Sequence, residues 1–209
     1  PRLIFVNKMD RENANYESAM ASITDTFGRQ CVALQVPIGA EDSFTGSYDL
    51  LDPDAAVPKG LGDAFESARE ALTELIAETD DELTMKYLEG EALTPDELLQ
   101  GLKQGVLSGT IVPVLFGAAL SGIGAEALLS AIIDLVPSPA EAPDTAAETS
   151  DGEISLSTRN GSPMAALVFK TAADQFVGKL SYIRVYSGGF KSDNQIWNAS
   201  RDEAERVGQ

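Results

Sequence analysis

The chain opens on a short apolar run that passes directly into a polar cluster. The run is Leu3-Ile4-Phe5-Val6, and the cluster that follows it is Asn7-Lys8-Met9-Asp10. Four apolar and partly β-branched residues predict a buried strand of a parallel sheet. Open α/β sheets bind their ligands at the edge where the carboxyl ends of the strands lie. The opening residues therefore predict an α/β fold with a binding loop over residues 7–10.

The polar cluster has the chemistry to recognise guanine. An ionised Asp10 can accept two parallel hydrogen bonds from the guanine N1–H and the exocyclic amine, which adenine cannot supply. Asn7 can hold the loop to its neighbours and reach the base N7, while the methylene stem of Lys8 covers the ring. The alternative is that Asn, Lys and Asp are ordinary turn and helix-start residues after a strand.

A second apolar run, Ile111 to Phe116, is followed by Gly117-Ala118-Ala119-Leu120. Small residues at the end of a strand allow a ligand to approach the backbone closely, and an amide N–H there can donate to the guanine O6. The alternative is that Gly and Ala at this point only permit tight packing of a helix on the sheet.

Between and after these runs the pattern predicts alternating strands and helices. We expect a helix over Tyr16–Phe27 ended by Gly28, a strand over residues 32–38, a turn-rich stretch over 39–47, and an edge strand over 48–51 before Pro53 and Pro58. Three helices follow, over about 62–79, 80–89 and 94–109, the last with a capping box from Thr94 to Glu97. A final helix is predicted to bury Leu128, Leu129, Ile132, Ile133 and Leu135 before Pro137. This order predicts the C-terminal half of a doubly wound sheet over residues 1–137, with an inserted helical subdomain over about 40–109.

The composition changes after Pro137. Residues 138–162 are rich in Pro, Ala, Glu, Asp, Thr and Ser, which predicts a linker. Strand patterns then follow at 165–170, 179–186 and 195–198, with Gly188-Gly189 as a turn. Short strands without helices predict the beginning of an antiparallel β-barrel over 163–209, with too few strands to close it.

Charge and composition exclude several classes of function. The net charge is −18 and there is no histidine, so a histidine base or metal ligand is excluded. Residues 1–163 hold 9 Lys and Arg against 28 Asp and Glu, whereas residues 164–209 hold 6 against 5. RNA contact is therefore expected from the second part, although general solubility also explains an acidic surface. The single cysteine, Cys31, excludes an internal disulfide. The sequence has no run of 18 apolar residues, so it predicts no membrane span.

Six stretches together resemble bacterial elongation factor G, in the right order and over nearly the whole chain. They are Asn7-Lys8-Met9-Asp10-Arg11, Val36-Pro37-Ile38-Gly39-Ala40-Glu41-Asp42, Lys86-Tyr87-Leu88-Glu89-Gly90, Gly109-Thr110-Ile111-Val112-Pro113-Val114-Leu115, Val136-Pro137-Ser138-Pro139 and Phe176-Val177-Gly178-Lys179-Leu180. The resemblance implies a translational GTPase that drives tRNA and mRNA movement on the ribosome. It implies that this chain is the second half of a P-loop GTPase domain, its helical insertion and the start of the second, β-barrel domain.

The resemblance also assigns roles to particular residues. Asn7, Lys8 and Asp10 resemble the base-specificity motif, and Ala118, Ala119 and Leu120 resemble the family's Ser-Ala-Leu motif. Ala118 stands where the family usually has Ser, which removes a hydroxyl that braces the loop but leaves the backbone amides; Gln175 stands where the family often has Pro. The implied cofactors are GTP and GDP with Mg²⁺. The implied partners are the ribosomal stalk protein and small-subunit RNA and protein, with no membrane or DNA partner, for a cytoplasmic monomer.

The sequence holds no Gly-rich phosphate loop ending in Gly-Lys-Ser/Thr, and none of the Mg²⁺-binding and water-orienting groups that GTP hydrolysis needs. Because the chain begins directly on a core strand, Pro1 is expected to mark a cut inside a larger protein. The chain by itself is expected to be inactive and to bind guanine nucleotide no better than about millimolar. The alternatives are a ribosome-binding paralogue that does not hydrolyse GTP, or a relative of the ribosomal-protection and release factors.

Overall fold

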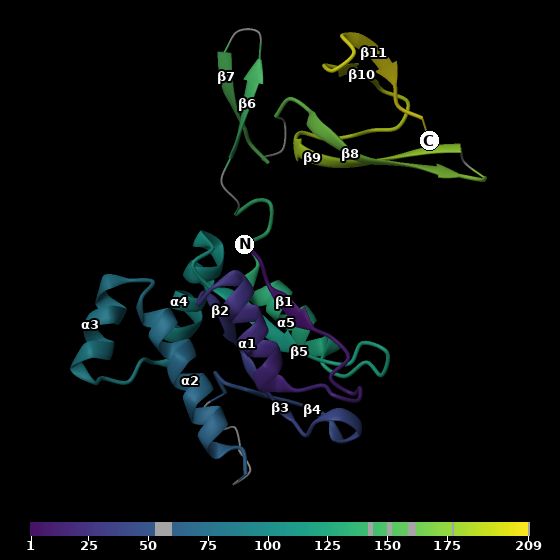
Figure 1. Cartoon of the computed structure of the whole chain (residues 1–209). Coiled ribbons are helices and arrows are strands. Elements are labelled where there is room, and N and C mark those ends of the chain that lie inside the picture. The colour runs from purple at the N-terminus through teal and green to yellow at the C-terminus, as the bar shows by residue number, and fades with distance from the viewer. Residues whose placement is uncertain (53–59, 142–143, 150–151, 159–161, 177, 209) are drawn as a thin grey trace. The chain divides into compact units, whose positions relative to one another are not determined.

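The computed structural model describes residues 1–52, 60–141, 144–149, 152–158, 162–176 and 178–208 (Figure 1). It divides into an N-terminal unit, Pro1–Pro137, and a C-terminal unit, Ser138–Gln209. Pro53, Pro58, Val177 and parts of the predicted linker lie outside the described residues. No helix within the described ranges is long and apolar enough to cross a membrane.

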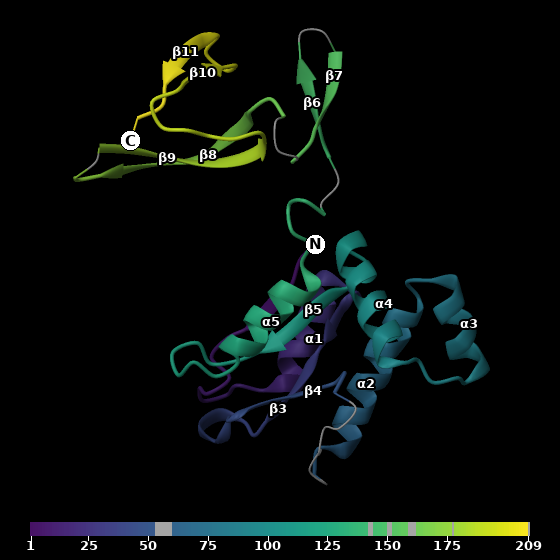
Figure 2. The same cartoon turned by 180° about the vertical axis from the view of Figure 1, so that it is seen from behind.

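The N-terminal unit is built on a parallel sheet in the order β1-β5-β2. Its strands are β1 (Ile4–Val6), β5 (Val112–Phe116) and β2 (Cys31–Ala33). Helices α1 (Tyr16–Phe27) and α5 (Ala125–Leu135) lie on opposite faces of this sheet (Figures 1 and 2). Since both faces are covered, all five residues of β5 are buried, as expected for a continuous apolar run in a parallel sheet. The predicted α/β fold with a parallel sheet is confirmed.

The strand predicted over residues 32–38 is two strands. Residues Cys31–Ala33 form β2 in the parallel sheet, whereas β3 (Gln35–Ile38) pairs antiparallel with β4 (Gly46–Asp49). The chain changes sheets at Leu34, whose N–H donates to the carbonyl of Val114 and whose carbonyl accepts from Leu50. An uninterrupted apolar pattern records burial and does not record a change of partner strand, so this break could not be predicted from it. Between β3 and β4, Glu41–Ser43 form one 3₁₀ turn.

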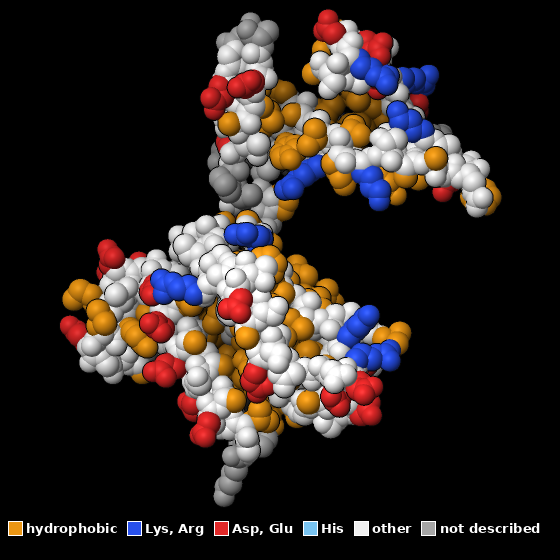
Figure 3. Space-filling model, viewed as in Figure 1, with side chains coloured by type: hydrophobic (Ala, Val, Ile, Leu, Met, Phe, Trp, Pro, Cys, Tyr) orange, Lys and Arg blue, Asp and Glu red, His pale blue; other side chains and the backbone are white. Residues whose placement is uncertain are grey.

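Three helices follow the β3–β4 hairpin as predicted. They are α2 (Gly62–Ala77), α3 (Asp81–Glu89) and α4 (Pro95–Ser108). Asp80 caps α3, and Thr94 and Glu97 form the expected capping box of α4. Asp and Glu side chains outnumber Lys and Arg over α2 and α3 in Figure 3, while the opposite sides of α2 and α4 contribute to the core. The acidic surface is therefore a solvated face of packed helices.

The burial predicted for the last helix is partly wrong. Ala131 and Leu135 of α5 are buried, but Ile132 is exposed, and Leu129 and Ile133 are 60% and 79% exposed. Leu128, Ala131 and Leu135 share one stripe at helical spacing, and Leu129 and Ile133 lie on another. Because apolar residues occupy both stripes, the sequence did not specify which of them faces the sheet.

The C-terminal unit consists of antiparallel hairpins. The pairs are β6 (Thr145–Thr149) with β7 (Gly152–Leu156), β8 (Ala165–Asp174) with β9 (Gly178–Ser187), and β10 (Gln195–Asn198) with β11 (Glu203–Arg206). The first hairpin falls inside the stretch predicted to be a linker. None of its described side chains is buried, so backbone pairing forms it without the hydrophobic pattern from which a strand is recognised. The described strands form no closed barrel.

Candidate functional site

The loops after β1 and β5 begin side by side because the two strands are parallel neighbours. Val6 is paired in register with Phe116, the last residue of each strand. The N–H of Gly117 donates to the carbonyl of Val6 at 3.0 Å, and the N–H of Met9 donates to the carbonyl of Gly117 at 3.1 Å. The side chain of Met9 is buried in the core and anchors its loop. The two stretches that the sequence proposed as one site are thus joined by their backbones.

Asn7 joins the two loops through its side chain. Its Oδ1 accepts hydrogen bonds from the N–H of Lys8, at 2.8 Å, and from the N–H of Ala119, at 2.9 Å. The second bond crosses 112 residues of sequence. An Asn oxygen has two lone pairs, and both accept hydrogen bonds here. The NH₂ group of the Asn7 side-chain amide is therefore the part that can donate to a ligand.

Lys8 and Asp10 occupy the outer part of the first loop. Lys8 has a left-handed backbone, with φ of 67°, and is exposed. The side chain of Asp10 is 28% exposed, and its Oδ1 lies 4.0 Å from Nε of the more exposed Arg11. An ion pair at this distance between solvent-accessible side chains contributes little to stability. The Asp10 carboxylate therefore has capacity to accept hydrogen bonds from a ligand.

The hydrogen bonds of the second loop show which of its backbone amides is available. The N–H of Ala118 donates to the carbonyl of Ile123 at 2.9 Å, and that of Ala119 donates to Asn7. Within the described part of the chain, the N–H of Leu120 has no acceptor, and its side chain is exposed. Ala118 is buried, and its backbone contacts hold the loop without the hydroxyl of a serine. Leu120 is therefore the residue of this loop best placed to offer an amide to a base oxygen.

Two glycines allow the loops to approach this closely. A Cβ at Gly117 would lie 2.4 Å from Cζ of Phe5 and 2.6 Å from the carbonyl oxygen of Ile123. Gly124 has φ of 82°, and its Cβ would lie 2.5 Å from the carbonyl oxygen of Phe116. Ile123 and Gly124 were not proposed from the sequence. The pair of glycines flanking Ile123 was the available signal, because such spacing marks a tight turn.

The described residues do not complete a site for phosphate or metal. They contain no group of three or more Cys, Asp or Glu side chains that could hold a metal ion. No basic or glycine-rich phosphate loop accompanies the two base-side loops in the sequence. The described residues therefore do not fit Mg²⁺.

Comparison with known proteins identifies a matching family and a similar solved structure. Residues 1–138 match the family model described as the elongation factor Tu GTP binding domain. The whole structure is similar to a crystal structure of a protein from Thermus thermophilus, with 26% sequence identity and a TM-score of 0.74. That match covers 99% of this chain and 30% of the other, so this chain spans less than a third of the length of its solved relative.

Proposed function

Because the chain belongs to the elongation factor Tu GTP-binding domain family, we propose that the loops after β1 and β5 recognise the guanine base of GTP and GDP. The observation that carries the proposal is the hydrogen bond from the N–H of Ala119 to Oδ1 of Asn7. It holds together two loops that each supply part of what distinguishes guanine from adenine.

Each group then has a chemical role. The Asp10 carboxylate accepts from N1–H and the exocyclic amine of guanine, and the N–H of Leu120 donates to O6. The NH₂ group of the Asn7 side-chain amide donates to N7 of the guanine, and the methylene stem of Lys8 covers one face of the ring. Adenine presents the opposite pattern, an acceptor at N1 and a donor at C6, and is rejected because it leaves Asp10 and Leu120 unsatisfied.

The wider role proposed is that of a translational GTPase of the elongation factor G type, which couples GTP hydrolysis to movement of tRNA and mRNA on the ribosome. The support is the order of the resembling stretches across the chain together with the family match. The acidic helical insertion suits a protein partner such as the ribosomal stalk, and the near-neutral residues 164–209 suit contact with ribosomal RNA and protein. The departure at Ala118 does not favour a non-hydrolysing paralogue, since the loop is held by its backbone.

The chain by itself supplies the base contacts only. Phosphate contacts carry much of the affinity of such nucleotides, and the Mg²⁺ that accompanies them also requires ligands outside these residues. We therefore expect the 209-residue chain to bind GMP and GDP no more tightly than a Kd of about 1 mM, equivalent to about −4 kcal/mol, and not to hydrolyse GTP.

The test is an NMR titration of the ¹⁵N-labelled chain with GMP, AMP and xanthosine monophosphate. GMP should shift the amide resonances of Asn7 and Leu120 saturably, and AMP should bind at least about tenfold more weakly, the effect of about 1.5 kcal/mol of lost hydrogen bonding to a charge. Asp10→Asn should lose the preference for guanine and favour xanthine, because an amide N–H can donate to the carbonyl that replaces the exocyclic amine.

Glu12→Gln is the matched control, since it removes the same charge two residues beyond Asp10 and should leave the order of affinities unchanged. Equal binding of GMP and AMP, or an unchanged preference in Asp10→Asn, would contradict the proposed base site. Micromolar binding of GDP by the chain alone would contradict the expectation that base contacts are all it supplies.

A further inference from the structure

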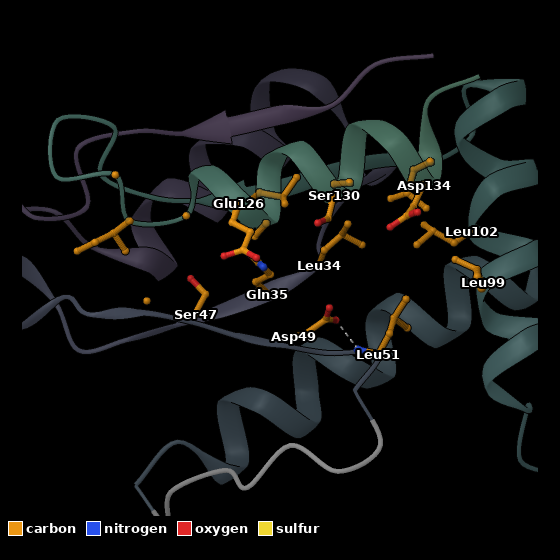
Figure 4. A pocket seen from close by; sticks show the side chains of 18 of the residues that line it. Leu34, Gln35, Ser47, Asp49, Leu51, Leu99, Leu102, Glu126, Ser130 and Asp134 are labelled. Carbon is orange, nitrogen blue, oxygen red and sulfur yellow. Dashed lines mark hydrogen bonds between the residues drawn. The ribbon is translucent and has the colours of Figure 1, made fainter. Parts of the chain in front are cut away.

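A cavity of about 590 Å³ lies between the β3–β4 hairpin, α4 and α5 (Figure 4). Its volume is in the range of sites that hold small organic molecules. Its apolar wall is formed by six leucines, Leu34, Leu51, Leu99, Leu102, Leu115 and Leu135. None of the residues that line it belongs to the loops Asn7–Asp10 or Ala118–Leu120, so the cavity is distinct from the candidate base site.

Two buried polar atoms in this cavity have no hydrogen-bond partner within the described structure. They are Oε1 of Gln35 and Oγ of Ser47. Gln35 is only 8% exposed, and Figure 4 shows its amide end directed toward the carboxylate of Glu126. Buried acceptors without donors cost free energy, and native structures seldom leave them so unless a ligand, ion or water satisfies them.

The register of the hairpin gathers the polar groups on one side. Gln35 is paired with Asp49, and Ser47 lies two residues before Asp49 on the same strand. Residues opposite one another across a pair, and residues two apart along a strand, point to the same face of a hairpin. The three side chains therefore meet the cavity together, as Figure 4 shows for Ser47, Gln35 and Asp49.

The charges that surround these groups are all negative. Asp49 lies on the hairpin, and Glu126 and Asp134 lie on α5. Among the described residues that line the cavity there is no Lys or Arg. Desolvation raises the pKa of Asp49, the Leu51 N–H lowers it by less, and the Asp52 charge raises it further. Asp49 is nevertheless an exposed residue, so its carboxylate is only partly desolvated, and a bound cation would reduce that cost.

We propose that this cavity binds a small organic cation with an apolar body, of the arylalkyl-ammonium class. The ammonium group donates to Oε1 of Gln35 and Oγ of Ser47 and pairs with the carboxylate of Asp49, while the hydrocarbon part contacts the leucine wall. The three carboxylates exclude an anion. A bare metal ion is disfavoured because no described group of three Asp, Glu or Cys side chains converges closely enough to hold one.

The experiment is an NMR titration of the ¹⁵N-labelled 209-residue chain with 2-phenylethylammonium chloride, in the absence of nucleotide. The neutral comparison is 2-phenylethanol, which has the same shape and no charge. The amine should bind saturably, with shifts at Gln35, Ser47 and Ala127, and at least tenfold more tightly than the alcohol. Because no nucleotide is present, this outcome is independent of the proposed base site.

Variants locate the binding. Asp49→Asn should weaken amine binding at least fivefold and leave the alcohol unaffected, whereas Asp63→Asn on α2 removes the same charge outside the cavity and should change neither. Ser130→Phe should block both ligands by filling the exposed side of the cavity, with the circular dichroism at 222 nm confirming that the helices are intact. Equal binding of amine and alcohol, unsaturable shifts, or no effect of Asp49→Asn would overturn the proposal.

Discussion

The strands β5 and β8 show two different ways in which this chain makes a sheet. All five residues of β5 are buried between two helices, and its strand neighbours are distant in sequence. Of the twenty residues in β8 and its partner β9, only Ser187 is buried, although the two strands are paired along nearly their whole length. Strand pairing and side-chain burial are therefore separate contributions to stability. We expect side-chain burial to be the larger contribution in the N-terminal unit.

The chain contains natural probes for each unit. All five α-helices of the described residues lie in the N-terminal unit, so circular dichroism at 222 nm reports its folding. The single tryptophan, Trp197, lies in β10 of the C-terminal unit and reports that region by fluorescence. Urea denaturation followed by both signals can therefore distinguish effects on the two units.

The largest effect is expected from Phe116→Ala. Phe116 is fully buried at the end of β5 and its ring packs edge-to-face on Tyr16, with centroids 5.1 Å apart. Loss of a buried aromatic ring leaves a cavity and lowers the free energy of unfolding by about 3–5 kcal/mol. The dichroism midpoint in urea should fall accordingly.

Phe169→Ala in β8 is the matched change in the C-terminal unit. Phe169 is 63% exposed, so its removal should cost less than about 1 kcal/mol and leave the dichroism midpoint unchanged. Phe116→Ala is followed by dichroism and Phe169→Ala by Trp197 fluorescence. If the two substitutions lowered their midpoints equally, the difference in burial between β5 and β8 would not explain the stability of the two units.

An intermediate effect is expected from Gly117→Ala. The added methyl group meets the Phe5 ring and the Ile123 carbonyl, so the loops must move apart at a cost of about 1–3 kcal/mol. GMP binding should weaken together with the dichroism midpoint, because this movement displaces Ala118 and Ala119. Gly189→Ala in the C-terminal unit is the control: its Cβ would meet nothing within 4 Å, and both signals should be preserved.

The smallest effect concerns the ion pair between Lys86 on α3 and Glu97 on α4. The hydrogen bond from Lys86, followed by that from the Thr94 N–H, lowers the pKa of Glu97 from 4.5 to about 2. A lowered pKa contributes stability that is present above about pH 4.5 and is lost as the pH falls toward 2. Because both side chains are solvated, the contribution is small.

Glu97→Gln isolates this contribution, since Gln keeps the capping box and removes the charge. The variant should have a slightly lower dichroism midpoint at pH 7 and a shallower loss of stability between pH 4.5 and 2. Glu205→Gln, which removes a charge from the C-terminal unit, should leave both the midpoint and its pH dependence as they are. Identical acid profiles for Glu97→Gln and the unaltered chain would show that the pair does not stabilise the folded state.

The candidate site shows where sequence reasoning succeeds and where it stops. The strand before Asn7 and the strand before Gly117 were recognisable from apolar runs, and parallel topology then predicted that their loops would meet. The bond from Ala119 to Asn7, and the engagement of the Ala118 amide by Ile123, depend on how two loops 112 residues apart are packed. Local patterns contain no information on such a pairing, so the availability of the Leu120 amide could not be predicted.

By itself, the sequence determined the helices, their caps and the α/β class, because hydrophobic periodicity and capping residues act over a few neighbouring positions. Only the tertiary structure decided which stripe of α5 is buried, where the chain leaves the parallel sheet at Leu34, and that Gln35, Ser47 and Asp49 share a cavity. Each of these depends on which distant segment supplies the neighbouring surface. Burial and hydrogen bonding are properties of a pair of surfaces, and a single stretch of sequence describes only one of them.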